Sequence, residues 1–266
     1  MTQDSRTLPD HATEALSVRG LSLRYGGVTA LEDVTISVPD QQIVGLIGPN
    51  GSGKSSFINV VSGAYRGPYQ GDIRIFGRDV TRIPAYRRAE TGLSRIFQGI
   101  RLFDTLTVEQ NVLIGAHTKY RTGYLRSVLR TPAARKEHRE QRERAYEIMA
   151  IFGDRLLPRR DQQVLSLSYA NRRRVEICRA LMSNPRLLLL DEPMAGMNPH
   201  ETEELTDQLR ALHTSARISM LLVEHKMGVI RDLCTDVYVL DGGRVIAHGT
   251  PEQVQQDEKV VEAFLG

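Results

Sequence analysis

The sequence predicts an α/β fold: a mixed sheet covered by helices, an antiparallel β part before it and a helical insertion within it. Three observations predict this fold. A glycine-rich loop at 48–56 joins an apolar strand to a helical pattern. Two apolar runs of strand length, 187–190 and 220–223, end in acidic residues. The stretch 99–180, between the loop and these runs, lacks the strand pattern.

The loop at 48–56, Gly-Pro-Asn-Gly-Ser-Gly-Lys-Ser-Ser, fits the pattern G-x-x-x-x-G-K-[ST] of a phosphate-binding loop. Its glycines let backbone N–H groups wrap an anion without Cβ clashes, and the following helix presents its positive N-terminal end. Lys54 is placed to reach the β- and γ-phosphates of a nucleotide, and Ser55 to bind Mg²⁺. Strand 43–47 precedes the loop and helical spacing over 56–61 follows it, so we predict a nucleotide site rather than a plain Gly-Ser turn.

Composition narrows the class of protein. The 266 residues allow one large domain or a core with an insertion, and no run approaches the ~18 apolar residues of a membrane span. Residues 1–15 are polar and lack the apolar centre of a secretory signal, so we expect a loose tail. Cys178 and Cys234 show no metal-ligand or redox spacing, which favours reduced cysteines of a cytosolic protein. The net charge of +3 is too small to indicate nucleic-acid binding.

The segment before the loop predicts an antiparallel β part. Apolar residues alternate over 16–24 and over 34–38, as in strands with one buried face. Tyr25 lies between them and has two interpretations: an aromatic ring that stacks on a purine base, or a core tyrosine that closes the hairpin. The pattern leaves both open.

Carboxylates follow the most apolar strand. The run 187–190 leads into Asp191 and Glu192, as expected of a central parallel strand that delivers acids to its carboxyl edge. Adjacent buried carboxylates are costly unless a cation is near, and Mg²⁺ is the natural partner of Asp191. Glu192 is then placed to orient or deprotonate an attacking water. The phosphate loop disfavours the alternative of a strand that simply reaches solvent.

Two further polar residues follow predicted strands. Gln98 comes directly after 95–97, and a phosphate loop upstream makes it a candidate for positioning Mg²⁺ or water, although such an amide is usually a surface group. His225 ends the strand at 220–223, on the sheet edge where a γ-phosphate would lie. A lone histidine is otherwise more often structural.

Residues 99–180 are predicted to be a helical insertion. Thr107 to Gln110 has the form of a capping box, and Thr131-Pro132 precedes a helix predicted over 133–152. Residues 119–144 hold nine Lys/Arg and three Glu, an excess of six positive charges. A solvated helix face is the ordinary interpretation and an anionic membrane surface the alternative, while the lack of interleaved aromatics argues against nucleic acid.

The stretch 167–181, Leu-Ser-Tyr-Ala-Asn-Arg-Arg-Arg-Val-Glu-Ile-Cys-Arg-Ala-Leu, resembles the signature segment of ATP-binding cassette (ABC) ATPases, ordinarily L-S-x-G-Q followed by a basic amphipathic helix. The phosphate loop, the Gln, this segment, the Asp-Glu-Pro strand and the His occur in the family's order and at its spacing over 16–250. The segments similar to ATP-binding subunits of branched-chain amino acid importers are the long insertion, 191–199, 223–227 and 249–266.

The resemblance implies a P-loop ATPase core, ATP and Mg²⁺ as cofactors, and a role for each site residue. Tyr25 is the implied adenine-stacking aromatic, Glu192 the general base and His225 the γ-phosphate contact. The implied phosphate contacts are Gly48, Asn50, Gly51, Ser52, Gly53, Lys54, Ser55 and Ser56. The residues implied to face Mg²⁺ are Ser55, Gln98 and Asp191. Gln98 is also counted among the catalytic residues.

The same resemblance implies partners. Ser168, Ala170 and Asn171 are expected to face the ATP held by a second ATP-binding subunit, because cassettes sandwich two nucleotides head-to-tail. Permease subunits on separate chains are expected to dock on the helical region near Gln98, at the cytoplasmic face of the membrane, with a solute-binding protein acting indirectly and no nucleic acid involved. The expected domains are a tail at 1–15, a β part with the phosphate loop at 16–98, a helical subdomain at 99–180, the second part of the core at 181–250 and a C-terminal helix at 251–266.

Three departures from the family pattern matter. Ala170 takes the place of the second signature glycine, so we expect its Cβ to push apart a contact with the partner's γ-phosphate, weakening it by roughly 1.5–3 kcal/mol. Asn171 replaces the Gln with a shorter amide, and Lys226 replaces an acid that many relatives carry after the His. The first two departures favour a heterodimer with one well-hydrolysing site and one weak site.

The implied function is an ATPase that couples MgATP binding and hydrolysis to uptake of branched-chain or other amino acids. Alternatives are a transporter of urea, short amides or other small solutes, and a regulatory ABC protein that hydrolyses weakly. An ABC protein of DNA repair or translation is less favoured, since those relatives usually carry two cassettes or long coiled-coil insertions.

Overall fold

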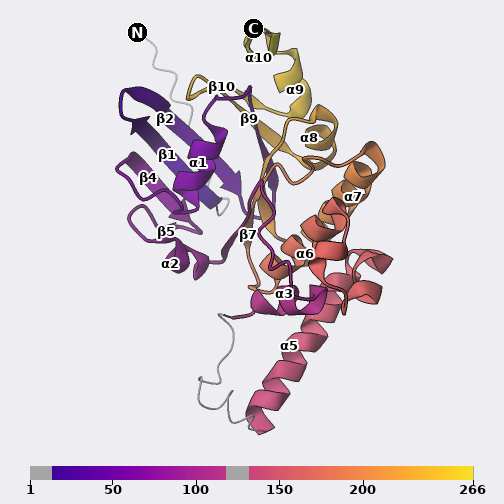
Figure 1. Ribbon diagram of the computed structural model, residues 1–266. Coiled ribbons are helices and arrows are strands. Elements are labelled where there is room, and N and C mark those ends of the chain that lie inside the picture. Colours follow the sequence, from indigo (N-terminus) through magenta and orange to yellow (C-terminus); the bar gives the residue numbers. More distant parts are fainter. Residues whose placement is uncertain (1–13, 118–131, 266) are drawn as a thin grey trace, which may run out of the picture.

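The computed structural model describes residues 14–117 and 132–265. Within these residues the strands form two sheets (Figure 1). In order across the six-stranded sheet, the strands are β10 (Arg244–Gly249), β9 (Asp236–Asp241), β3 (Ile43–Ile47), β8 (Ser219–Val223), β7 (Leu187–Asp191) and β6 (Leu93–Ile96). In order across the four-stranded sheet, they are β2 (Val28–Pro39), β1 (Glu14–Tyr25), β4 (Gln70–Ile75) and β5 (Arg78–Asp79).

Strand directions confirm the predicted mixed sheet and antiparallel part. β9, β3, β8, β7 and β6 run parallel, and β10 returns antiparallel beside β9 as the predicted hairpin. The four-stranded sheet is antiparallel throughout. Parallel strands place their carboxyl ends at one edge, so β3, β7, β8 and β6 deliver the phosphate loop, the acids, His225 and Gln98 to the same side of the molecule.

Both faces of the six-stranded sheet are buried, which explains the unbroken leucine run of β7. Leu187 and Leu189 belong to a core shared with α1 (Lys54–Val61) and the four-stranded sheet. Leu188 and Leu190 belong to a second core on the opposite face. Because side chains alternate along a strand, a strand buried on both faces carries no polar alternation.

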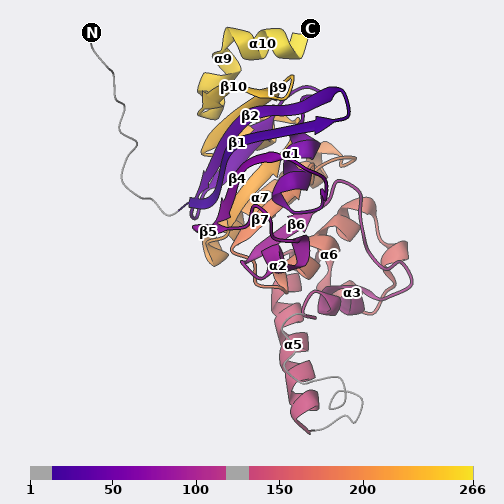
Figure 2. The same cartoon turned by 90° about the vertical axis from the view of Figure 1, so that its left-hand side faces the viewer.

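Several helices contribute residues to the second core. Three of them lie in the insertion between β6 and β7: α3 (Val108–Ile114), α5 (Pro132–Ala150) and α6 (Tyr169–Leu181). Two more, α7 (Pro199–Ala216) and α8 (Met227–Leu233), follow β7 and β8. Short elements elsewhere are α2 (Ala85–Ala89), α9 (Pro251–Gln256), α10 (Glu258–Leu265) and the 3-10 turns η1 (Gly153–Arg155), η2 (Leu157–Arg159) and η3 (Val164–Ser166). Figure 2 shows α5 projecting away from the sheets beneath α3 and α6. Among the described residues, no helix has the length and apolar composition needed to cross a membrane.

The predicted insertion is confirmed between β6 and β7. Thr107 caps α3 with the predicted reciprocal box to Gln110. The predicted cap at Thr131 and part of the basic stretch lie outside the described residues. Helix α5 ends at Ala150, two residues before the expected Phe152, shortly ahead of Gly153 in a left-handed conformation (φ 58°).

The chain ends in two helices, where the sequence led us to expect one. Asp257 separates α9 from α10, because its backbone is extended (ψ 121°). Its carboxylate accepts the Lys259 N–H at 2.9 Å, the side-chain bond by which Asp favours helix starts over helix interiors.

The crossing of α3 and α6 generates a stability prediction. A Cβ added at Gly115 meets the Arg179 carbonyl oxygen at 1.9 Å, a contact that backbone cannot relieve locally. We expect Gly115→Ala to lower the free energy of unfolding by about 1–3 kcal/mol, measured by denaturant titration. Gly228→Ala, where nothing lies within 4 Å, is the matched control. Equal stability of the two variants would contradict the prediction.

Candidate functional site

The phosphate loop is built from glycines that no other residue replaces easily. Gly48, Gly51 and Gly53 have φ values of 150°, 82° and 107°. A Cβ at Gly48 would meet the Leu240 carbonyl oxygen at 2.0 Å, and one at Gly53 would meet the Ala30 carbonyl oxygen at 2.6 Å. The loop therefore keeps its tight curvature only with glycine, and its last glycine is the N-cap of α1.

Lys54 folds back over this loop. Its Nζ donates to the carbonyl oxygens of Gly48 and Pro49, both at 2.8 Å, and to Ser52 Oγ at 3.3 Å. Burial lowers the pKa of Lys54, while the charges of Glu192 and Asp191 raise it in part. The ammonium group thus lies in the field of both acids.

Glu192 is held at both carboxylate oxygens. Gln98 Nε2 donates to Oε2 at 2.8 Å, and His225 Nε2 lies 2.8 Å from Oε1. The Glu192 backbone has a positive φ of 48°, and its N–H donates to the Val223 carbonyl oxygen at 3.0 Å. Three residues predicted separately from the ends of three strands therefore form one cluster.

Asp191 has a partner that the sequence analysis missed. Arg95 Nη2 lies 2.8 Å from Asp191 Oδ2, and the two side chains are only 8% and 7% exposed. The signal was available, because an arginine inside the short strand before Gln98 needs a buried anion to balance its charge.

Arg173 is a second missed residue. It is fully buried on α6 and donates to the backbone carbonyl oxygens of Phe97, at 2.6 Å, and Gln98, while pairing with Glu176 at 2.7 Å. Its Nη2 also reaches the Tyr169 hydroxyl at 3.1 Å. Arg173 therefore ties the N-terminal half of α6 to the backbone that carries Gln98. Its place in a run of three arginines hid it among solvated charges.

Residues of the loop after β8 form hydrogen bonds with the loop after β7. Glu224 accepts the Met194 N–H at 2.9 Å. Lys226 Nζ donates to Thr202 Oγ1 at 2.8 Å and to the carbonyl oxygens of Met194 and Met197 at 3.3 and 3.4 Å. A carboxylate at 226 has no donor for those carbonyls, so this departure from the family pattern makes a contact of its own.

The structure does not bring the signature residues into this cluster. Ser168 caps α6 by accepting the Asn171 N–H at 3.3 Å, and the Asn171 Oδ1 accepts from Arg174 at 3.1 Å. Ala170 is 2% exposed and packs in the second core. The methyl group is therefore covered within this chain, and the expected effect of its Cβ on a contact with a partner's γ-phosphate stays a prediction.

Tyr25 ends β1 and is 44% exposed. Its ring meets the Tyr65 ring edge-on, with centroids 5.5 Å apart. Of the two interpretations left open, the core tyrosine is disfavoured, since nearly half of the side chain is accessible.

The residues present fit a nucleotide and its magnesium ion. The loop keeps the tight curvature of a phosphate-binding loop because a Cβ at Gly48 or Gly53 would collide with neighbouring backbone, and Lys54 lies against it. The groups predicted to face the metal are the exposed Ser55 and Gln98 and the buried Asp191, whose oxygens form a set of the kind that Mg²⁺ prefers.

A family model described as ABC transporter matches residues 31–195. The chain belongs to the ABC transporter family. A second model, described as branched-chain amino acid ATP-binding cassette transporter, matches residues 244–266. Membership confirms the predicted cassette fold and the predicted class of ATP-hydrolysing transporter subunit.

Curated ABC relatives cover nearly the whole chain. The high-affinity branched-chain amino acid transport ATP-binding protein LivG of Escherichia coli (strain K12) is 38% identical over 94% of this chain and 97% of its own. The lipopolysaccharide export system ATP-binding protein LptB of Haemophilus influenzae is 34% identical over the same shares, 94% and 97%. A solved ABC transporter cassette in its ADP conformation has a TM-score of 0.81 and 31% identity, covering 95% of this chain and 99% of that one.

The position of Lys54 in this cassette predicts its contribution to nucleotide binding. Lys54→Met removes a buried ammonium group beside the loop, and a charge-assisted hydrogen bond of roughly 1.5–3 kcal/mol corresponds to about 10- to 100-fold weaker ATP binding. Titration with a fluorescent ATP analogue measures the effect. Lys259→Met, on α10, is the control, and unchanged affinity of the Lys54 variant would contradict the assignment.

Proposed function

We propose that this chain is the energy-coupling ATPase of a membrane importer of branched-chain amino acids, acting at the cytoplasmic face of the membrane. The observation that carries the proposal is the Glu192 carboxylate, held from both sides by Gln98 and His225 at the carboxyl edge of the sheet and next to Lys54. A carboxylate fixed in this way beside a phosphate loop is suited to act on a water that attacks the terminal phosphate.

The chain's own residues divide the work. Backbone N–H groups of the loop and Lys54 bind the phosphates, and Tyr25 stacks on the adenine base. The Glu192 carboxylate accepts a proton from the attacking water, while the Gln98 amide and the His225 ring keep that carboxylate aligned. Ser55, Gln98 and Asp191 would hold Mg²⁺, which when bound would neutralise phosphate charge at the reacting group. The His225 contact with the γ-phosphate belongs to this proposal.

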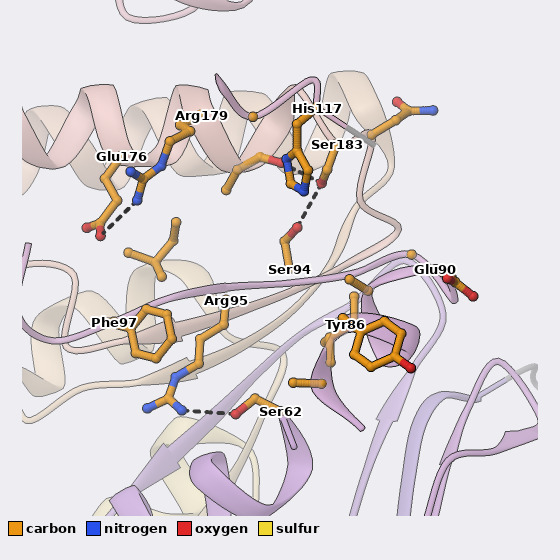
Figure 3. A pocket seen from close by; sticks show the side chains of 18 of the residues that line it. Ser62, Tyr86, Glu90, Ser94, Arg95, Phe97, His117, Glu176, Arg179 and Ser183 are labelled. Carbon is orange, nitrogen blue, oxygen red and sulfur yellow. Dashed lines mark hydrogen bonds and ion pairs between the residues drawn. The ribbon is translucent and has the colours of Figure 1, made fainter. Parts of the chain in front are cut away.

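A cleft beside the cluster is the proposed docking site for permease subunits on separate chains. It has a volume of about 1020 Å³ and lies between α2 and β6 on one side and α3 and α6 on the other. Figure 3 shows Tyr86, Phe97 and His117 around it, with Glu176 and Arg179 on one wall. A permease segment inserted there would contact β6, which leads into Gln98, and α6, which carries Arg173. Its movement would therefore change the position of Gln98 relative to Glu192.

The second ATP-binding subunit is proposed to be a sister chain. Asn171 supports this: Arg174 engages its short amide within its own helix, so the side chain reaches less far toward a partner's nucleotide than the family's glutamine. The test compares Glu192→Gln in this chain with the corresponding change in the partner, in the assembled transporter. We expect unequal losses of ATPase activity, and equal losses in a complex whose two sites turn over independently would contradict the heterodimer.

The solute assignment rests on the match of residues 244–266 to the branched-chain amino acid model and on relatives such as LivG. LptB, at a similar identity, is described as serving lipopolysaccharide export, so overall identity alone does not select the solute. The solute-binding protein acts outside this chain. ATPase activity of the reconstituted complex, screened with branched-chain amino acids, other amino acids, urea and short amides, tests the choice. Stimulation only by a non-amino-acid would contradict it.

The hydrolytic role generates a mutational prediction. Glu192→Gln keeps the size of the side chain, replaces one acceptor oxygen with an NH₂ donor and removes the basicity of the group. We expect ATP affinity to stay within about twofold and turnover to fall by at least about 10²-fold, the range of general-base catalysis. Phosphate release measures turnover. Glu203→Gln, an exposed change on α7, is the control, and an unchanged kcat in the Glu192 variant would remove Glu192 from this role.

A further inference from the structure

Arg95 hydrogen-bonds to side chains from two elements of the site. Its Nη2 meets Asp191 Oδ2 at 2.8 Å. Its Nη1 donates to Asn59 Oδ1 at 2.8 Å and to Ser62 Oγ at 2.9 Å, the latter drawn in Figure 3. One guanidinium group therefore bridges the end of β7 and the helix that follows the phosphate loop.

The two anchors on α1 lie on the same face as Ser55. Asn59 and Ser62 follow Ser55 by four and seven residues, the spacing that aligns side chains along one side of a helix. Ser55 stands in the first turn, where the chain leaves the loop. Arg95 thus fixes the position of the Asp191 carboxylate relative to the helix that carries the Ser55 hydroxyl.

The guanidinium group is itself fixed. Its carbon lies 4.4 Å from the centroid of the Phe97 ring, and the side chain is only 8% exposed. Burial lowers the pKa of Arg95, whereas the Asp191 charge raises it. A buried, planar cation with three hydrogen-bonded partners has little freedom to turn, so it also restricts the carboxylate that it holds.

We propose that Arg95 is a positioning residue for the metal site: it engages Asp191 Oδ2, leaves the other carboxylate oxygen for the magnesium shell, and fixes the spacing between Asp191 and Ser55. This inference rests on the proposed placement of Mg²⁺ between those two residues. Without Arg95, the Asp191 carboxylate turns toward Lys54, the other cation in whose field it lies. Metal binding then weakens while the phosphate loop stays intact.

The experiment measures the factor by which saturating Mg²⁺ strengthens binding of a fluorescent ATP analogue to the full-length chain, relative to binding with EDTA. Mn²⁺ titration by electron paramagnetic resonance, with ATP present, gives the metal affinity directly. For Arg95→Met we expect EDTA-state affinity within about twofold of the wild type, and a metal enhancement reduced about 10-fold or more. Arg95→Lys, which keeps the charge but cannot reach all three partners, falls between.

Arg101→Met is the matched control. Arg101 also lies against the Phe97 ring, 3.8 Å from its centroid, and makes no contact with Asp191 among the described residues. Its metal enhancement should equal that of the wild type. Ser62→Ala removes one anchor of the guanidinium without touching Asp191, and we expect a smaller loss in the same direction. This variant decides the matter if Arg95→Met does not fold.

Three results would overturn the inference: unchanged or greater metal enhancement in Arg95→Met, an equal loss in Arg101→Met, or a loss of EDTA-state affinity as large as the loss with Mg²⁺. Each would assign Arg95 a structural or purely electrostatic role. A wild-type protein that binds ATP without any metal enhancement would overturn the proposed metal placement instead, and the inference with it.

Discussion

Two adjacent acids at the end of a buried strand impose the main constraint on this molecule. Asp191 and Glu192 leave the sheet beside the phosphate loop, where uncompensated negative charge would oppose both folding and the binding of a polyphosphate. The structure compensates them differently. Arg95 forms an ion pair with Asp191. Gln98 donates a hydrogen bond to Glu192, and the His225 ring lies within hydrogen-bond distance of it. The two acids therefore differ in environment, as their proposed roles require.

The surrounding elements follow from this compensation. β6 must lie beside β7, because it brings Arg95 to Asp191 and Gln98 to Glu192. β8 must lie on the other side, because it ends at His225. The helical insertion is tied to the same point through Arg173, which holds the backbone around Gln98. A displacement of α6 would thus change the backbone that carries Gln98.

The loops after β7 and β8 form a second connection. Glu224 and Lys226 bind the backbone of 194–197 from opposite ends of one short segment. His225 lies between them and reaches Glu192. The position of His225 is therefore coupled to the loop that leads into α7, and the lysine that departs from the family pattern strengthens that coupling.

The sequence alone determined the fold class, the phosphate loop and the acids, because glycine spacing and apolar periodicity report local backbone geometry directly. It also placed Gln98 and His225 at strand ends, though not their shared contact with Glu192. Only the tertiary structure decided which groups the buried residues contact: Arg95 pairs with Asp191, Arg173 donates to the backbone of Phe97 and Gln98, and Ala170 packs in the second core. The physical reason is that the role of a buried charge or methyl group depends on the groups packed against it, and those groups come from segments distant in the chain.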